Sequence, residues 1–275
     1  MGRTQSRILP WFGSDASVCE HHARLLADCK HVTVLMVGGG SILSYLAKTA
    51  REIVCNDKHS LAINLFRVIS DRDWCERLIQ KLYITPFHEE VLAEAQLHCK
   101  NHQKTLTEID PGLAFSYFVT CWMGRSGKSG TNSELNGKLA LRWDAGGGSS
   151  PLRFRTAVKS LQEVWGPICE RCSFVCRDWT EIINNVKDSS ELGCYIDGPW
   201  PEDGDDYLHT FRNPQDHIRL RNELLRFSKT KIVIRYGDKK LVRDLYSESR
   251  WHIQELGSRD QANGSVKELC ITNFS

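Results

Sequence analysis

The sequence predicts an α/β fold with a parallel-rich, doubly wound sheet, and three features lead to this prediction. A continuous apolar run, His31 to Val37, is rich in β-branched residues and is followed at once by three glycines. A second short apolar strand, Glu52 to Cys55, ends at Asn56-Asp57. Strand and helix patterns alternate on both sides of a central region of different character, residues 71–151. Apolar strands joined by helices are typical of parallel sheets whose faces are both covered.

The first strand and its glycines begin a unit that is typical of nucleotide-type cofactor sites. Ser41 is expected to cap a helix that continues through Lys48, and Ser60 to cap another whose apolar side includes Leu61 and Phe66. The acid Asp57 ends the strand between these helices. The order of strand, glycine loop, helix, strand and acid predicts a cofactor-binding half of the chain.

The central region predicts an insertion that carries flexible recognition loops. Its helical stretches give way to a loop rich in Gly, Ser and Lys, Met123 to Thr131, and a second glycine cluster occupies residues 146–148. The predicted helices are Trp74 to Leu82, His88 to Cys99 and Ala114 to Trp122.

The last third of the chain returns to alternating strands and helices. Helices are predicted at Arg155 to Trp165, Asp216 to Phe227 and Lys239 to Tyr246, and strands at Ser173 to Cys176, Cys194 to Ile196, Lys231 to Tyr236 and Trp251 to Leu256. Residues 257–266 are predicted to form a loop, with a short edge strand at Leu269 to Ile271. The predicted domains are therefore a catalytic and cofactor-binding α/β domain, residues 1–70 and 152–275, and an inserted recognition region, residues 71–151.

Composition is that of an ordinary globular chain, with 41% hydrophobic and 25% charged residues and a net charge of +2. No apolar run approaches the roughly 20 residues that span a bilayer, and the N-terminus lacks the apolar core of a signal peptide. We therefore expect an intracellular, cytoplasmic protein with no membrane partner.

The 11 cysteines are expected to be free thiols. Cys169, Cys172 and Cys176 lack the second ligand pair of a structural zinc site, so no metal is expected.

The run Asp197-Gly198-Pro199-Trp200 follows an apolar strand and brings together an acid, a tight turn and an aromatic ring. Such a set suits a flat ring that bears an amino group: the carboxylate and a backbone carbonyl can accept its hydrogens, and the indole can stack on it. Asp-Gly-Pro is also common turn chemistry after a strand, so this segment alone does not decide between the two interpretations.

In order and spacing, these segments resemble the Dam-type (alpha-group) DNA adenine-N6 methyltransferases. Pro10-Trp11-Phe12-Gly13 is similar to the family's N-terminal aromatic-glycine motif, and Asn56-Asp57-Lys58-His59 to its Asn-Asp segment. Asp178 stands where the family places an acid near the cofactor's adenine. Asp197-Gly198-Pro199-Trp200 stands in the place of Asp-Pro-Pro-Tyr, and Val233 to Asp238 closes the similarity.

The resemblance implies a Rossmann-like, S-adenosylmethionine-dependent fold and site-specific methylation of a flipped-out adenine at its N6 amino group. It assigns the catalytic role to Asp197, Gly198, Pro199 and Trp200. Cofactor contacts are implied for Trp11, Gly13, Val37, Gly38, Gly39, Gly40, Asp57 and Asp178. The implied partner is double-stranded DNA, on which the protein would be nucleoid-associated, and a restriction partner is left open. A monomer is expected, with a homodimer as the alternative.

The recognition loops carry the residues predicted to contact DNA. Cations on mobile loops suit contacts to phosphates, and a solvated basic surface is the alternative explanation. The predicted DNA-binding residues are Arg125, Lys128, Ser129, Thr131, Arg142, Arg153 and Arg155.

Three motifs depart from the family pattern. Gly13-Ser14-Asp15 lacks a lysine, Gly38-Gly39-Gly40 replaces Pro-Phe-x-Gly, and Gly198 and Trp200 replace a proline and a tyrosine. A catalytically silent DNA-binding protein, and a methyltransferase acting on RNA or a free nucleotide, are therefore the alternative functions. We expect Gly198→Pro to be tolerated or activating and Asp197→Ala to abolish methylation.

Overall fold

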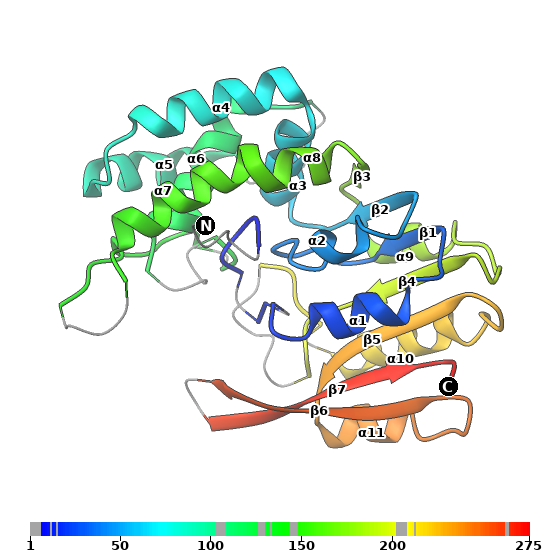
Figure 1. Ribbon diagram of the computed structural model, residues 1–275. Helices are drawn as coiled ribbons and strands as arrows, with labels where there is room; N and C mark the ends of the chain where they lie inside the picture. Colours follow the sequence, from blue (N-terminus) through cyan, green and yellow to red (C-terminus); the bar gives the residue numbers. More distant parts are fainter. Residues whose placement is uncertain are drawn as a thin grey trace. The chain divides into compact units, whose positions relative to one another are not determined.

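The computed structural model describes residues 7–11, 13–14, 16–102, 108–125, 130–132, 134–143, 148–201, 208–211, 213–261 and 264–275. The chain forms two compact units, each assembled from separate stretches of sequence (Figure 1). The first unit comprises Met1–Ala16, Gly38–Ser44 and His59–Cys176, and the second comprises Ser17–Val37, Tyr45–Lys58 and Arg177–Ser275.

The second unit contains a mixed sheet. Its strands lie in the order β2-β1-β4-β5-β7-β6. β1 pairs in parallel with β2 and β4, and β4 pairs in parallel with β5, whereas β7 runs antiparallel to both β5 and β6. The bounds are β1 (His31–Val34), β2 (Glu52–Asn56), β4 (Leu192–Ile196), β5 (Lys231–Gly237), β6 (His252–Gln261) and β7 (Gly264–Thr272). The predicted parallel-rich sheet is confirmed.

Helices cover both faces of this sheet. Figure 1 shows α1 (Cys19–Leu25) in front of the strands and α9 (Trp179–Ile183) and α10 (Pro214–Leu224) behind them. α11 (Lys240–Leu245) follows β5 along the chain. Asn213 and Asp216 form a capping box that satisfies backbone N–H groups at the start of α10. Strands β4 and β5 are almost wholly buried, as the apolar sequence of a central parallel strand requires.

The first unit is mainly helical. Figure 1 shows α4 to α7 in cyan and green. Helix α6 is buried along nearly its whole length and packs against α3 and α5, which explains its almost uninterrupted apolar sequence. The bounds are α3 (Ser60–Ser70), α4 (Arg72–Ile84), α5 (Glu89–Asn101), α6 (Pro111–Met123), α7 (Ser150–Ser160), the π-helical turn η1 (Leu161–Trp165), α8 (Gly166–Cys169) and β3 (Cys172–Val175).

Three predictions for the N-terminal elements were wrong. Strand β1 ends at Val34 rather than Val37, because the chain then turns: Leu35 N–H donates to the Tyr195 carbonyl and Val37 N–H to that of Asn56. The helix predicted from Ser41 to Lys48 is a single turn, α2 (Leu43–Leu46). The cap of α3 is His59, whose Nδ1 accepts from the Ala62 N–H, so Ser60 is its first helical residue.

The end of the chain also differs from the prediction. Residues 257–266, predicted to be a loop, belong mostly to the long strands β6 and β7. The pairing of β5 with β7 stops at Gly237 and Glu268, whereas β6 and β7 remain paired as far as Gln261 and Gly264. A two-stranded ribbon needs no apolar sequence, so its polar composition resembles that of a loop. Leu269 to Ile271 lie inside the sheet, between β5 and β6, and not at its edge.

All eleven cysteines are free thiols. Cys169 is buried, and Cys172 and Cys176 are half-buried around β3. Among the residues that the structure describes, no group of three or more His, Cys, Asp or Glu side chains is arranged to hold a metal ion. Within the same residues, no helix is long and apolar enough to cross a membrane.

Candidate active site

The parallel strands of the second unit end together at one edge of its sheet. Val34 is paired with both Cys55 and Tyr195, and Ile196 is paired with Ile234. Residues that follow these strands therefore lie along the same edge: the turn 35–37, Asp57 and Asp197. Chain order reverses between β1 and β4, and ligands of open α/β sheets bind outside the carboxyl ends of strands at such a reversal.

Asp197, the first residue after β4, is held by an arginine from β5. Arg235 Nη1 donates to both carboxylate oxygens of Asp197, at 3.1 and 3.0 Å. The remainder of the guanidinium faces Glu268 of β7, with Nε 3.2 Å from Oε2 and Nη2 2.7 Å from Oε1. Arg235 is fully buried, and the Asp197 side chain retains 18% of its exposure. Asp197 is therefore held in position and is still partly exposed.

The electrostatics of this cluster keep the arginine charged. Burial lowers the pKa of Arg235, but the charge of Asp197 and the hydrogen bonds to Glu268 outweigh burial, so its pKa is raised above the usual value. On the neighbouring helix α1, burial and the charge of Arg235 lower the pKa of His22 to about 3. Among the described residues, the charged side chains of this cluster are therefore Asp197, Arg235 and Glu268.

Trp200 lies against β5. Its side chain is 8% exposed, and the Arg235 guanidinium carbon is 4.9 Å from its ring centroid. A Cβ placed on Gly237 would be 2.6 Å from Trp200 Cε3 and 2.9 Å from Cζ3. The indole therefore needs a glycine at position 237, and its plane is fixed by the strand and by Arg235.

Gly198 has a close neighbour of its own. A Cβ at this position would be 2.9 Å from Met36 Sδ and 3.1 Å from its Cε. Met36 belongs to the turn after β1, so the two turns at the edge of the sheet touch. Position 198, at which the family resemblance places a proline, is a glycine here, and the Met36 side chain occupies the space that a larger residue would need.

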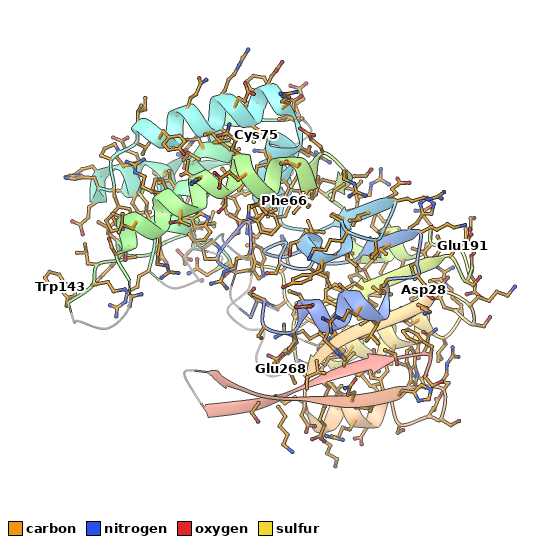
Figure 2. The ribbon with its side chains drawn as sticks, viewed as in Figure 1. Asp28, Phe66, Cys75, Trp143, Glu191 and Glu268 are labelled. Carbon is orange, nitrogen blue, oxygen red and sulfur yellow. The ribbon has the colours of Figure 1, made fainter. Side chains whose placement is uncertain are left out.

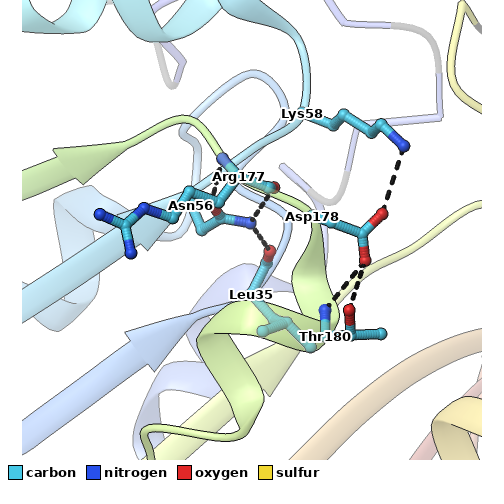
Figure 3. A network of polar contacts seen from close by, with 6 residues as sticks. All are labelled: Leu35, Asn56, Lys58, Arg177, Asp178 and Thr180. Carbon is cyan, nitrogen blue, oxygen red and sulfur yellow. Dashed lines mark hydrogen bonds and ion pairs between the residues drawn. The ribbon is translucent and has the colours of Figure 1, made fainter.

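Asn56 connects the turns on the other side of β1 (Figure 3). Its Nδ2 donates to the Leu35 carbonyl at 3.0 Å and to the Arg177 carbonyl at 3.1 Å, and its Oδ1 accepts from the Arg177 N–H at 3.0 Å. The side chain is 1% exposed. One amide thereby fixes the backbone that precedes Asp57 and Asp178.

Asp178 caps α9 and forms an ion pair with Lys58 (Figure 3). Its Oδ1 accepts from the Thr180 backbone N–H and hydroxyl at 3.1 and 2.8 Å, and Lys58 Nζ is 3.2 Å from Oδ2. Partial burial raises the pKa of Asp178, but these hydrogen bonds outweigh it, so its pKa lies below the usual value. Asp57 is 9% exposed at the same edge of the sheet.

In the first unit, the glycine turn packs on the N-terminal segment. Gly38 and Gly40 have φ of +51° and +76°, which side-chain-bearing residues rarely adopt. A Cβ on Gly39 would be 2.8 Å from both the Leu9 carbonyl oxygen and Trp11 Cβ. Trp11 is half-buried, with its ring centroid 5.6 Å from that of His59. The structure thus brings Trp11 and the glycines together.

The predicted DNA-binding residues have different environments in the first unit. Arg142 and Arg153 are exposed, and Arg125 is exposed at the end of a short ladder in which its N–H donates to the Lys138 carbonyl at 2.8 Å. Thr131 is buried. Arg155 is half-buried and donates to backbone carbonyls at the end of α4, those of Leu82, Tyr83 and Thr85. Lys128 and Ser129 lie outside the described residues.

Sequence reasoning missed several members of this arrangement. Arg235 received no role, although a charged residue inside the apolar run of β5 was a usable signal. The Asn-Asp segment that contains Asn56 predicts no partner for its amide, and no motif indicates the contact between Met36 and Gly198. Glu268 had no signal, because its position opposite Arg235 depends on the β5–β7 register.

Three comparisons relate the chain to known proteins. No curated protein matches the chain. One similar solved structure is described as an rRNA methylase from Streptococcus thermophilus; the identity is 8%, the TM-score is 0.41, and the alignment covers 94% of this chain and 96% of that chain. The model of the D12 class N6 adenine-specific DNA methyltransferases matches residues 11–258. Because that match extends over most of the sequence, the chain belongs to the D12 class N6 adenine-specific DNA methyltransferase family.

Proposed function

We propose that the protein uses S-adenosylmethionine to methylate the N6 amino group of a flipped-out adenine at specific sites in duplex DNA. One observation carries the assignment of the chemistry: Asp197 stands at the carboxyl edge of the parallel strands, held by Arg235 and still partly exposed. This is the arrangement expected of an acceptor that receives an amino group from outside the sheet.

The proposed role of the catalytic segment follows from the chemistry of the amino nitrogen. Its lone pair is delocalised into the adenine ring, which makes it a poor nucleophile. Asp197 and the Gly198 carbonyl would accept its two hydrogens, orient the nitrogen and stabilise the positive charge that develops on it. Pro199 would hold the turn, and the buried indole of Trp200 would present an edge or face to the base. Holding both reactants in line then supplies several kcal/mol of the barrier.

The residues at the edge of the sheet fit a nucleoside-bearing methyl donor. When bound, such a donor supplies the activated methyl group. Two acids there suit its hydroxyl and amino hydrogens, and we propose Asp57 for the ribose hydroxyls and Asp178 for the adenine amino group. Val37 is buried and offers an apolar contact. Trp11, Gly13 and the glycines 38–40 are proposed to contact the donor through ring and backbone.

For DNA, we propose that the exposed cations of the first unit contact phosphates. Arg125, Arg142 and Arg153 are the exposed candidates among the described residues. Lys128 and Ser129, which lie outside the described residues, and Thr131, which is buried, complete the proposed set. Residues 71–151 are proposed to be the target-recognition region. The hydrogen bonds of Arg155 to the end of α4 favour a structural role for that side chain.

Expression in a methylation-deficient host, followed by modified-base sequencing of the host DNA, tests the proposal. The expected result is N6-methyladenine at a defined sequence motif. The Asp197→Ala protein should leave no such mark, whereas Asp244→Ala, which removes an exposed aspartate from α11, should leave the mark unchanged. Unmethylated DNA from a host that contains folded wild-type protein would refute the proposal. Methylated RNA in that host would favour the RNA alternative.

A further inference from the structure

Three charged side chains of the second unit, Glu268, Arg235 and Asp197, form a connected row of ion pairs that ends at the proposed catalytic carboxylate of Asp197. Glu268 of β7 receives two hydrogen bonds from Arg235 of β5, whose remaining nitrogen, Nη1, holds both oxygens of Asp197. The side chains of Arg235 and Glu268 retain 1% and 4% of their exposure. Figure 2 labels Glu268 on β7. Position 268 lies beyond the residues matched by the family model, which end at 258.

The contacts of Arg235 with Glu268 and Asp197 restrict how these side chains are oriented. Arg235 contacts Glu268 through two nitrogens, Nε and Nη2, which restricts the orientation of both groups in a way that a lysine at the same place could not. The third nitrogen, Nη1, is thereby aimed at Asp197 and donates to both of its oxygens. The same guanidinium lies over the Trp200 ring at 4.9 Å. Arg235 therefore connects the acid and the aromatic ring of the catalytic segment.

The charges of Asp197, Arg235 and Glu268 affect the proposed reaction. A buried arginine beside Asp197, with no other partner, would cancel the negative charge that the developing positive charge on the amino nitrogen needs. Glu268 supplies a second carboxylate, so these three side chains together carry a net charge of −1. His22, which also faces Arg235, adds no charge at neutral pH, because burial and the charge of Arg235 lower its pKa to about 3.

We propose that Arg235 is a positioning residue for Asp197 and Trp200, and that Glu268 balances its charge so that Asp197 remains a fully negative acceptor. The inference rests on the proposed function, and it adds a requirement for the C-terminal strand. β7 would thus be part of the catalytic apparatus rather than only an added strand of the sheet.

Steady-state kinetics of Glu268→Gln test the charge balance, because this substitution keeps the size of the side chain and removes its charge. We expect kcat to fall about ten- to hundredfold, while KM for DNA and for the donor stays within about twofold. Arg235→Lys keeps a positive charge but cannot contact Glu268 through two nitrogens and Asp197 through a third, and a similar fall in kcat is expected. The matched control is Glu255→Gln, which removes an exposed carboxylate from the adjacent strand β6 and should leave kcat unchanged.

The ¹⁵N guanidinium signals of Arg235 in the ligand-free protein test the geometry independently of activity. Asp197→Asn and Glu268→Gln should each shift these signals and speed their hydrogen exchange, whereas Glu255→Gln should not. An unchanged kcat in Glu268→Gln, or Arg235 signals that do not respond to Asp197→Asn, would overturn the inference while the wild-type protein still methylates DNA. A wild-type protein that transfers no methyl group would instead refute the proposed function.

Discussion

The indole ring of Trp200 covers Gly237 so closely that a Cβ on the glycine would be 2.6 Å from Cε3 of the ring. We therefore expect Gly237→Ala to displace the ring, lower the free energy of unfolding by about 1–3 kcal/mol and weaken methyl transfer. Equilibrium unfolding and single-turnover methylation measure the two effects. In a Trp200→Ala background the same glycine substitution should cost little, because the Trp200 ring atoms are the neighbours that the new methyl group would meet.

Gly148→Ala is the matched control for this pair, because a Cβ at that position meets no atom within 4 Å. It should change neither unfolding nor methylation. Equal losses in Gly237→Ala whether Trp200 is present or absent would contradict the steric explanation.

Gly198 and Met36 form a second sterically coupled pair. The sequence suggested that Gly198→Pro is tolerated or activating, but a Cβ there would be 2.9 Å from Met36 Sδ. A thioether is flexible and can move, so we expect the single variant to fold with a loss of about 1–3 kcal/mol. Shortening the neighbour in Met36→Ala/Gly198→Pro should restore methyl-transfer rates relative to Gly198→Pro alone. If the double variant is slower than Gly198→Pro, Met36 does not limit proline at this position.

The Asn56 amide holds the backbone next to Asp57 and Asp178, the two aspartates that we propose bind the cofactor. Asn56→Asp replaces a buried donor that faces two carbonyl groups by an acceptor, so at least one carbonyl loses its partner. The expected cost is about 1–3 kcal/mol or more of unfolding free energy, together with a raised Kd for S-adenosylmethionine in calorimetry. The control is Asn185→Asp, at an exposed amide that donates to the Glu181 carbonyl. If a stable Asn56→Asp protein binds S-adenosylmethionine with unchanged Kd, the Asn56 amide has no role in cofactor binding.

His22 predicts an acid-sensitive stability. Burial, and then the charge of Arg235, lower its pKa from 6.5 to about 3, so the unfolded state binds the proton first as pH falls. The stability from neutral His22 is complete above pH 6.5, falls by about 1.4 kcal/mol per pH unit below it, and is fully lost below pH 3. Chemical unfolding at pH 7 and 5 should show a smaller decrease in His22→Leu than in the wild type. The exposed-site variant His252→Gln should follow the wild type.

The fold was predictable from the sequence where burial decides the pattern. Strands such as Lys231–Gly237 are apolar because both of their faces are covered, and that requirement is visible in one dimension. The far end of β6 and β7 was not predicted as strand. There the two strands pair with each other beyond the end of β5, so their residues can be polar. Likewise, Asp197 was identified from its own neighbours in the sequence. Its partner Glu268 is set by strand register, a relation between distant segments that no local pattern records.

Arg153 and Arg155 make a matched pair on one helix. Arg153 is exposed in the first turn of α7, so Arg153→Gln should weaken DNA binding and reduce the slope of log K against log salt by about 0.9 if it contacts one phosphate. Arg155 donates to three carbonyls at the end of α4, at 2.9, 2.7 and 2.9 Å. Arg155→Gln should instead lower the free energy of unfolding by about 1.5–3 kcal/mol and leave the salt slope unchanged. Fluorescence anisotropy over a range of KCl concentrations, combined with urea unfolding, separates the two roles. A reduced salt slope in Arg155→Gln would assign that arginine to the DNA interface despite its contacts with α4.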